Sequence, residues 1–328
     1  MHVLRSLVLG AALSLSASVA SAQAYNMTLS GASPSGFWTM IGVGVDSVMK
    51  AAHPGSTITY QTSGGGLANV GLLDQGKVEL GLAHDAELRI AADGGKPFSK
   101  PIRSLRAIAA LYDWAPMQMI VSKKFADTHG IRTFEDIAAK KPPLRIALNK
   151  RGNITEYVAV KMLNAIGVDL KDIEKWGGAV IYAASDEQGD LMKDKRIDMF
   201  ANGTFVRTNF ILQAGNSVEL VLLPVSEAVV KRVSSELGVK PFLIKAGSYE
   251  WQPQDVTTVA LSASLVVNEK MDDKIAYDLA RALHQHLDKL RAVHGSFKAM
   301  PTELLVSQNV IPYHKGAEKY YREAGLIK

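Results

Sequence analysis

A short apolar strand, a loop of small polar residues and an amphipathic helix follow one another repeatedly along this chain. In the first unit, residues 25–29 read as a strand, residues 31–36 as a loop, and residues 37–52 as a helix whose apolar side chains recur every three or four positions. The stretch 56–76 repeats the same order. Such alternation predicts an α/β fold built on parallel sheets.

A second series of these units opens near Leu144, which predicts a second domain. Residues 105–112 and 116–124 read as two separate strands, and residues 255–268 as a long β-branched strand that returns to the first domain. Because no low-complexity linker separates the two series, we expect the domains to be joined by crossing strands that act as a hinge. The expected division is a leader over 1–24, a first domain of 25–120 with 247–328, and a second domain of 121–246.

The first 24 residues have the pattern of an export signal. Arg5 precedes an apolar run over residues 7–15, and small residues follow up to Ala22 or Ala24. The run is shorter than the ~20 residues that a membrane-spanning helix needs. We therefore expect cleavage after Ala22 or Ala24 and a periplasmic mature protein.

The composition argues against several classes of function. The formal charge is only +5 over 328 residues, and Lys and Arg are spread among Asp and Glu, so we expect no nucleic-acid partner. The chain has no cysteine, and therefore no thiol nucleophile, cysteine zinc site or iron–sulfur cluster. His284 and His286 are two apart on a predicted helix and point to different faces. We expect neither a metal nor an organic cofactor.

Four loops rich in Gly, Ser, Thr and Asn follow predicted strands, at 31–36, 62–66, 149–155 and 202–204. In open parallel sheets the ligand site lies beyond the carboxyl ends of the strands, where loops lead into helix N-termini. Glycine lets backbone N–H groups approach a ligand, and a helix N-terminus favours negative charge. Two loops from each domain would thus enclose a small anion. The predicted ligand-binding residues are Ser33, Ser35, Gly36, Ser63, Gly64, Gly65, Gly66, Asn69, His84, Asp85, Arg151, Gly152, Asn153, Thr155, Asn202, Gly203 and Thr204.

Two charged residues near these loops each have two interpretations. Asp85 follows an apolar strand and could cap a helix or bind an ammonium group. Arg151 could hold a carboxylate through two parallel hydrogen bonds, or it could point into solvent beside Lys150. The sequence leaves both pairs of interpretations open.

Nucleotide-binding motifs fit the chain poorly. Residues 71–77 match G-x-x-x-x-G-K, but Val78 stands where a phosphate-binding P-loop needs Ser or Thr. Asn69 occupies the place of the third glycine of a dinucleotide fingerprint. A nucleotide or nicotinamide cofactor is therefore not expected.

Several longer segments have a pattern beyond the strand and helix periods: SGGG at 63–66 with Asn69, VELGLAHDAE at 78–87, GIRTFEDIAAKK leading into PLRIALNKRGNIT, KAGSYEWQPQDVTTVALSASLVV at 245–267, and IPYHKGAEKYYREAG at 311–325. Together these segments resemble the TAXI-type solute receptors of tripartite ATP-independent periplasmic (TRAP) transporters. The resemblance implies a two-domain, bilobal periplasmic-binding-protein fold, type II-like, with hinge strands and a central ligand cleft. It also implies that the protein is not an enzyme, that it binds a small carboxylate such as glutamate or a dicarboxylate, and that its partner is a TRAP membrane permease. We expect a monomer.

Two loops depart from the pattern of these receptors. GASPSGFWTM at 31–40 stands where a Gly-Thr pair and tyrosines are usual, and NKRGNIT at 149–155 stands where a Gly-Ser-Gly-Thr loop is usual. Both loops would line the expected pocket, so the departures concern the ligand more than the fold.

Two alternatives to a transport receptor stay open. One is a secreted α/β hydrolase that uses Ser33 or Ser35 as nucleophile, with His84 and Asp85 as partners. The other is a receptor that presents bound solute to a sensor kinase, which would share the same binding chemistry and differ only in its partner.

Overall fold

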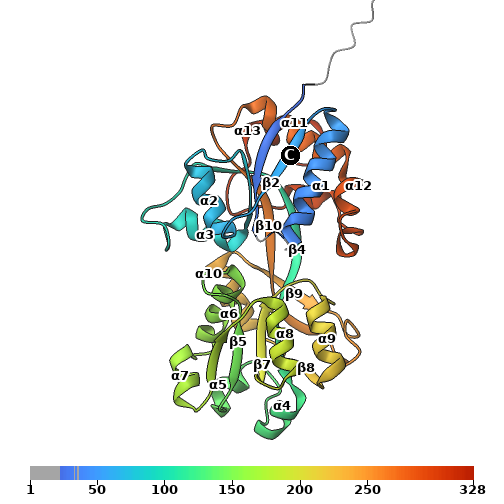
Figure 1. Ribbon diagram of the computed structural model, residues 1–328. Coiled ribbons are helices and arrows are strands. Elements are labelled where there is room, and N and C mark those ends of the chain that lie inside the picture. Colours follow the sequence, from blue (N-terminus) through green and yellow to red (C-terminus); the bar gives the residue numbers. More distant parts are fainter. Residues whose placement is uncertain (1–22, 33, 35–36) are drawn as a thin grey trace, which may run out of the picture.

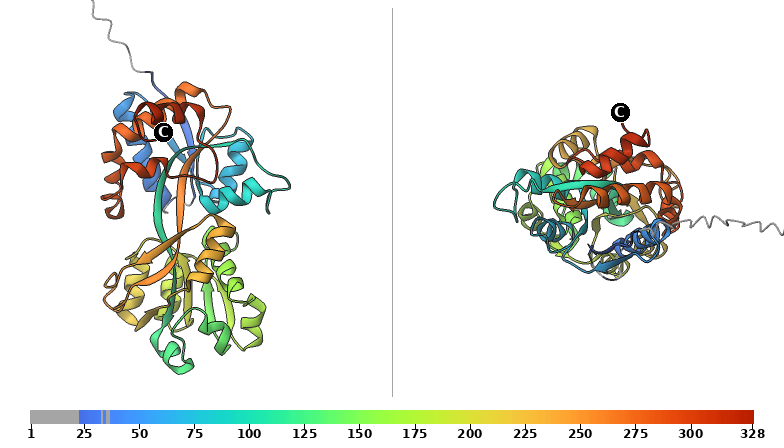
Figure 2. Two further views of the ribbon diagram at one scale, coloured as in Figure 1. Left: turned by 180° about the vertical axis from the view of Figure 1, so that it is seen from behind. Right: turned by 90° about the horizontal axis from the view of Figure 1, so that it is seen from above.

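The computed structural model describes residues 23–32, 34 and 37–328, which form two lobes stacked end to end (Figure 1). Two long strands, β4 (Leu105–Ser122) and β10 (Val256–Asn268), run through the junction and pair with each other antiparallel. The view from behind shows the same two strands connecting the lobes (Figure 2). No helix within the described ranges is long and apolar enough to span a membrane. The predicted leader lies almost wholly outside the described residues.

The first lobe is built on a sheet with the strand order β2-β1-β3-β10-β4. Its short strands are β1 (Asn26–Ser30), β2 (Thr57–Gln61) and β3 (Leu80–His84). These three are parallel, because a helix returns the chain after each of them, whereas β10 is antiparallel to β3. Their carboxyl ends therefore meet at one edge of the sheet.

Helices cover both faces of this sheet (Figure 1). The first buries the stripe of apolar residues that the sequence predicted, including Trp38, Ile41 and Val45. The predicted helix that carries His284 and His286 is divided in two, because it breaks at His286. The elements are α1 (Phe37–Ala52), α2 (Gly66–Asp74), α3 (Asp85–Asp93), α11 (Asp273–Gln285), α12 (Leu287–Arg291), α13 (Lys315–Glu323), and the 3-10 turns η1 (Gly295–Phe297) and η2 (Thr302–Val306).

The second lobe repeats the arrangement with the strand order β4-β7-β5-β6. The strands β5, β6 and β7 are parallel, while β8 pairs with β4, and β9 pairs with the first half of β10. The strands are β5 (Arg145–Leu148), β6 (Ala179–Tyr182), β7 (Met199–Gly203), β8 (Leu220–Leu222) and β9 (Lys240–Ile244). The helices are α4 (Lys123–His129), α5 (Asp136–Lys140), α6 (Ile154–Ala165), α7 (Leu170–Lys175), α8 (Ser185–Lys193), α9 (Asn209–Ser217) and α10 (Glu227–Leu237).

The prediction of two separate strands over 105–112 and 116–124 is wrong, because β4 is one strand of 18 residues. Asp113 and Trp114 interrupt its apolar pattern and look like a turn in the sequence. In the structure β10 pairs with β4 on both sides of this interruption, with register shifts near Tyr112. Pairing with a distant strand therefore keeps the backbone extended where the local pattern does not.

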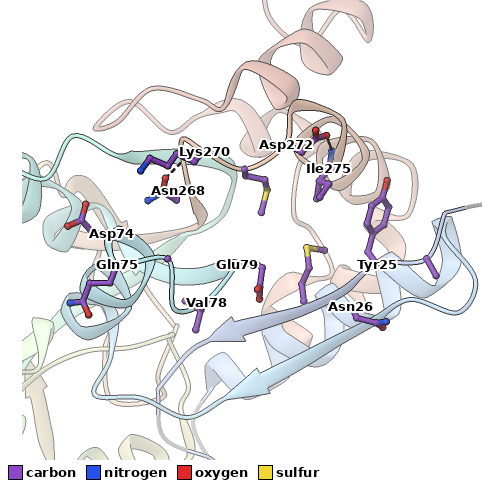
Figure 3. Close-up of a pocket in the computed structure, with 14 residues that line it drawn as sticks. Tyr25, Asn26, Asp74, Gln75, Val78, Glu79, Asn268, Lys270, Asp272 and Ile275 are labelled. Carbon is purple, nitrogen blue, oxygen red and sulfur yellow. Dashed lines mark hydrogen bonds between the residues drawn. The ribbon is translucent and has the colours of Figure 1, made fainter.

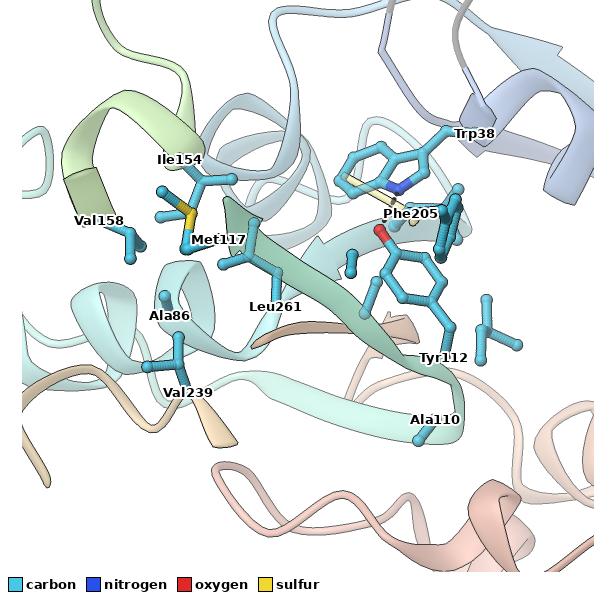
Figure 4. Close-up of a cluster of buried hydrophobic side chains, with 14 of the residues drawn as sticks. Trp38, Ala86, Ala110, Tyr112, Met117, Ile154, Val158, Phe205, Val239 and Leu261 are labelled. Atoms are coloured by element: carbon cyan, nitrogen blue, oxygen red, sulfur yellow. Dashed lines mark hydrogen bonds between the residues drawn. The ribbon is translucent and has the colours of Figure 1, made fainter. Parts of the chain in front are cut away.

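The apolar core continues through the junction (Figure 4). Met117 of β4 and Leu261 of β10 are almost fully buried there. Ile154 and Val158, from the start of α6, pack into the same cluster. The two lobes thus share side-chain contacts as well as backbone. The predicted domain boundaries at residues 120 and 246 stay a prediction, since the crossing strands belong to both lobes.

Candidate ligand cleft

A cavity of about 230 Å³ lies between the lobes, at the carboxyl ends of their parallel strands. The loops after β1, β2 and β3 form its wall in the first lobe, and the loops after β5, β6 and β7 form its wall in the second. This is the place where open α/β sheets hold their ligands. The lining residues are Ala32, Phe37, Trp38, Gly64, Gly65, Gly66, His84, Glu87, Asn149, Gly152, Asn153, Ile154, Thr155, Ser185, Asn202, Gly203 and Thr204.

Helix N-termini from both lobes border the cavity. Gly65, which precedes α2, has φ 100, a backbone conformation that favours glycine, and no side chain caps this helix. The N–H groups of Gly66 and Leu67 have no hydrogen-bond partner among the described residues, and neither has that of Ile154 at the start of α6. Such unpartnered donors favour an anionic ligand.

Ser63 and Asn69 hold the glycine loop in place but do not line the cavity. The amide of Asn69 is fully buried and donates to the carbonyl oxygens of Gly31 (2.7 Å) and Leu82 (2.8 Å). The Ser63 hydroxyl lies within hydrogen-bond distance of Gly31 O and Asn69 Oδ1, and it accepts from the N–H of Gly65. These bonds fix the loop after β2 to the ends of β1 and β3, so the loop is preorganised.

The second lobe contributes a network of neutral amides. Asn202 is buried and donates from Nδ2 to Ser185 Oγ (2.9 Å) and Gln188 Oε1 (3.0 Å). Asn153 caps α6, because its side-chain oxygen accepts from the N–H and from the hydroxyl of Thr155. This wall is therefore polar and rigid, and it has no formal charge.

Four side chains of the first lobe form one chain of hydrogen bonds. The indole N–H of Trp38 donates to Tyr112 Oη (3.0 Å), which lies 3.1 Å from His84 Nε2. The other ring nitrogen of His84 lies 3.0 Å from Glu87 Oε2, and this oxygen also accepts from the His84 backbone N–H (2.8 Å). Burial raises the pKa of Tyr112, which keeps its hydroxyl proton at neutral pH.

An aromatic extension of about 140 Å³ adjoins the cavity. Phe205, just after β7, lies edge-on against Phe37 with ring centroids 4.5 Å apart, and against Tyr112 at 5.2 Å. Figure 4 shows Phe205, Trp38 and Tyr112 close together beside the crossing strands. The cavity therefore has polar groups at its loops and an apolar floor near the hinge.

The charges around the cavity differ from the sequence expectation. Neither lysine nor arginine is among the described residues that line it. Arg151 is exposed, with its guanidinium carbon 4.0 Å from the centre of the Tyr182 ring, and Lys150 is exposed beside it. Glu87 is the carboxylate of the lining, only 4% exposed.

Asp85 lies behind the cavity wall. It is the first residue of α3, whose capping position belongs to His84, so Asp85 does not act as the cap. Its carboxylate accepts from the Ser262 hydroxyl (2.5 Å) and from the Gln308 amide (3.4 Å). Burial raises the pKa of Asp85 despite the hydrogen bond from Ser262.

The structure thus gathers most of the predicted loop residues around one cavity. The predicted residues that line it are Gly64, Gly65, Gly66, His84, Gly152, Asn153, Thr155, Asn202, Gly203 and Thr204. Four others, Ser63, Asn69, Asp85 and Arg151, lie nearby without lining it. Ser33, Ser35 and Gly36 lie outside the described residues.

Several lining residues were missed by the sequence reasoning. Glu87 had a detectable signal, because a Glu three residues after a helix cap is the pattern of a capping box. Trp38 belongs to the apolar stripe of α1, and helical periodicity alone indicates only that its side chain is buried. Ser185 follows a strand of the second lobe, so the strand-end rule that identified the other loops also applied to it. Asn149 lies in the predicted loop 149–155 but was not among the predicted ligand-binding residues.

A larger cavity, about 460 Å³, lies on the first lobe alone (Figure 3). Tyr25 and Asn26 at the start of β1 line it, together with Asn268 at the end of β10. A ligand there would not be enclosed by both lobes. Among the described residues, no group of three or more His, Asp or Glu side chains could hold a metal ion.

The two lobes, the crossing strands and the cleft between them make up the bilobal, type II-like fold of periplasmic binding proteins. The chain belongs to the NMT1-like family, whose sequence profile matches residues 29–325. The expected two-domain fold with crossing strands and a central cleft is confirmed.

Solved structures of low sequence identity share this fold. PhnD1 from Prochlorococcus marinus, in complex with methylphosphonate, has 12% identity and a TM-score of 0.55, covering 92% of this chain and 99% of its own. MatC from Rhodopseudomonas palustris, with bound malate, has 13% identity and a TM-score of 0.54, covering 93% and 99%.

Proposed function

We propose that this protein is an exported receptor that captures a small carboxylate between its lobes and delivers it to a membrane permease of the TRAP type, as TAXI-type receptors do. The observation that carries the proposal is the cavity bounded by both lobes, with unpartnered N–H groups at the start of α2 and α6. These donors supply the partners of a carboxylate without any basic side chain. The proposed ligand-binding residues are those of the predicted set that line the cavity.

The proteins of similar fold support an anionic ligand. Malate and methylphosphonate, which MatC and PhnD1 hold, are both small anions. A transport receptor closes around its solute by bending at strands that cross between the lobes, and β4 and β10 provide such strands here.

A hydrolytic function has less support. A base for a serine would need His84 Nε2, because Nδ1 faces Glu87, but Nε2 is engaged by the buried hydroxyl of Tyr112. Asp85 is held by Ser262 rather than by His84. A signalling partner in place of the permease would leave the binding chemistry unchanged.

Native mass spectrometry of the freshly purified mature protein tests the proposal, and a carboxylate of low mass should be present. Ile154→Pro then removes one donor, because proline lacks an N–H yet is accepted at the first position of a helix. The preceding Asn153 has φ −77 and ψ 140, which a following proline tolerates. We expect calorimetry to show affinity for the carried carboxylate lowered at least tenfold, about 1.4 kcal/mol.

Ile154→Ala is the matched control, since it also loses the buried side chain but keeps the N–H group. It should bind within about threefold of wild type, a difference of roughly 0.6 kcal/mol. Equal losses in both variants would assign the effect to packing, and absence of any bound or binding carboxylate would remove the proposed function.

A further inference from the structure

Glu87 places a negative charge inside a cavity that otherwise suits an anion. Its carboxylate lies at the N-terminus of α3, where Oε2 accepts two bonds from His84. It also lies directly against the α-carbon of Gly66, at the N-terminus of α2. The first lobe therefore already holds an anion of its own at the helix ends that face the cleft.

The chain of hydrogen bonds that ends at Glu87 indicates which atoms of His84 and Tyr112 donate and which accept. The indole N–H of Trp38 can only donate, so Tyr112 Oη accepts from it. The Tyr112 hydroxyl then donates its own hydrogen bond to His84 Nε2. His84 Nδ1 then carries a proton, which it donates to Glu87 Oε2. Every N–H and O–H group of this chain of hydrogen bonds thus has an acceptor, and Glu87 serves only as an acceptor.

One oxygen of Glu87 remains available to a ligand. Oε1 has no hydrogen-bond partner among the described residues, and Glu87 lines the cavity although its side chain is only 5% exposed. An ionised carboxylate can only accept. A ligand that reaches this oxygen must therefore bring a donor, and a second carboxylate there would be repelled.

We propose that Glu87, held by His84, is the specificity-determining residue of the cleft and selects carboxylates that also carry a protonated amino group. The inference rests on the proposed function and orients the ligand within it. The carboxylate of the ligand lies at the start of α6 in the second lobe, and the ammonium group faces Glu87 in the first. Carboxylates without an amino group lack a partner for Glu87 and bind more weakly.

Calorimetry with three matched pairs tests this selection: L-glutamate with glutarate, L-aspartate with succinate, and L-alanine with propionate. Within each pair the amino group is the difference. We expect the tightest ligand to be an amino acid that binds at least tenfold more tightly than its partner. A compound without an amino group that binds as tightly as its pair, or more tightly, overturns the role of Glu87 without touching the proposed function.

Glu87→Gln should lower the affinity for the amino acid at least tenfold and leave or raise the affinity for its partner. Glu187→Gln is the matched control, because Glu187 occupies the same position of α8, accepts from the N–H of Ala184, and is exposed outside the cavity. Equal losses for both members of a pair would make Glu87 structural. If Glu87→Gln fails to fold, the affinities of wild type for the three pairs of compounds still test the selection.

Native mass spectrometry of the same preparation distinguishes failure of the selection by Glu87 from failure of the proposed receptor function. A carried carboxylate without an amino group overturns the inference and leaves the proposed function. No carried carboxylate and no binding of any of the six compounds overturns both.

Discussion

Gly66 and Glu87 are packed so closely that a methyl group on Gly66 would lie 1.7 Å from Glu87 Oε2. The two residues belong to different helices, α2 and α3, whose N-termini meet at the cleft. A side chain at this position could be accommodated only if the Glu87 carboxylate moved. The contact fixes where the negative charge of the first lobe lies.

Gly66→Ala should displace Glu87 and weaken ligand binding at least tenfold, about 1.4 kcal/mol. Calorimetry with the carried ligand measures the loss, and thermal melting measures any change in stability. Gly71→Ala is the control, because Gly71 lies on the same helix outside the cavity lining and its added methyl group would meet nothing within 4 Å. Similar affinities for wild type and Gly66→Ala would contradict the close packing.

Phe205→Ala should shift the lobes toward a more open arrangement. Phe205 belongs to the second lobe and is 9% exposed, and its ring contacts Phe37 and Tyr112 of the first lobe. Aromatic pairs of this kind contribute roughly 0.5–1.5 kcal/mol each beyond the area they bury. Small-angle scattering should show a larger radius of gyration for the variant without ligand, and compaction of the wild type with ligand.

Leu243→Ala is the control for this experiment, because Leu243 lies on β9 and is 40% exposed. It should scatter as wild type does. Superimposable profiles for Phe205→Ala and wild type, with and without ligand, would argue against a hinge held by this contact.

Asp278→Asn should remove a pH-dependent part of the stability. Asp278 is 2% exposed and binds the Tyr25 hydroxyl (2.5 Å), Lys274 (2.6 Å) and Arg281 (2.8 Å). Burial by itself would raise its pKa, but the hydrogen bonds from Lys274 and Tyr25 outweigh this effect and lower it. A carboxyl whose pKa is lower in the folded state stabilises the fold above its unfolded value, and this stability is lost as the pH falls through the folded value.

The wild type should therefore lose stability as the pH falls below the ordinary aspartate value of 3.8, and Asp278→Asn should lose less over that interval. At neutral pH the variant should be less stable by about 1–3 kcal/mol, as for loss of hydrogen bonds to a charged group. Urea unfolding at several pH values measures both effects. Asp288→Asn, at an exposed residue, should follow the wild type.

Export should leave a mature chain that begins near Gln23 or Tyr25. N-terminal sequencing of protein from the periplasmic fraction measures this directly. An intact Met1 on protein recovered from the cytoplasm would contradict the predicted leader.

The α/β alternation was predictable because it depends on local periodicity. The apolar stripe of α1 and the loops after β2 and β5 are visible in the printed sequence, and the structure has them where the pattern indicates. The loop predicted at 202–204 is wrong in its bounds, because β7 continues through Gly203 by pairing with β4. The unity of β4 was not predictable, because Asp113 and Trp114 interrupt the pattern and pairing with β10 keeps the strand extended. Strand pairing joins residues about 150 positions apart, which no local window contains.

The loops of the cleft likewise depend on local sequence, whereas its chemistry depends on contacts between distant elements. The sequence by itself determined that glycine and small polar residues would follow the strands, because those residues permit tight turns beside helix N-termini. Only the tertiary structure decided that Ser63 and Asn69 support the loop, that Arg151 rests on Tyr182, and that Glu87 faces the ligand. The positions of Glu87 and His84 depend on Tyr112 and Trp38, which lie on β4 and α1, so contacts between separate elements of the fold define the charge of the site.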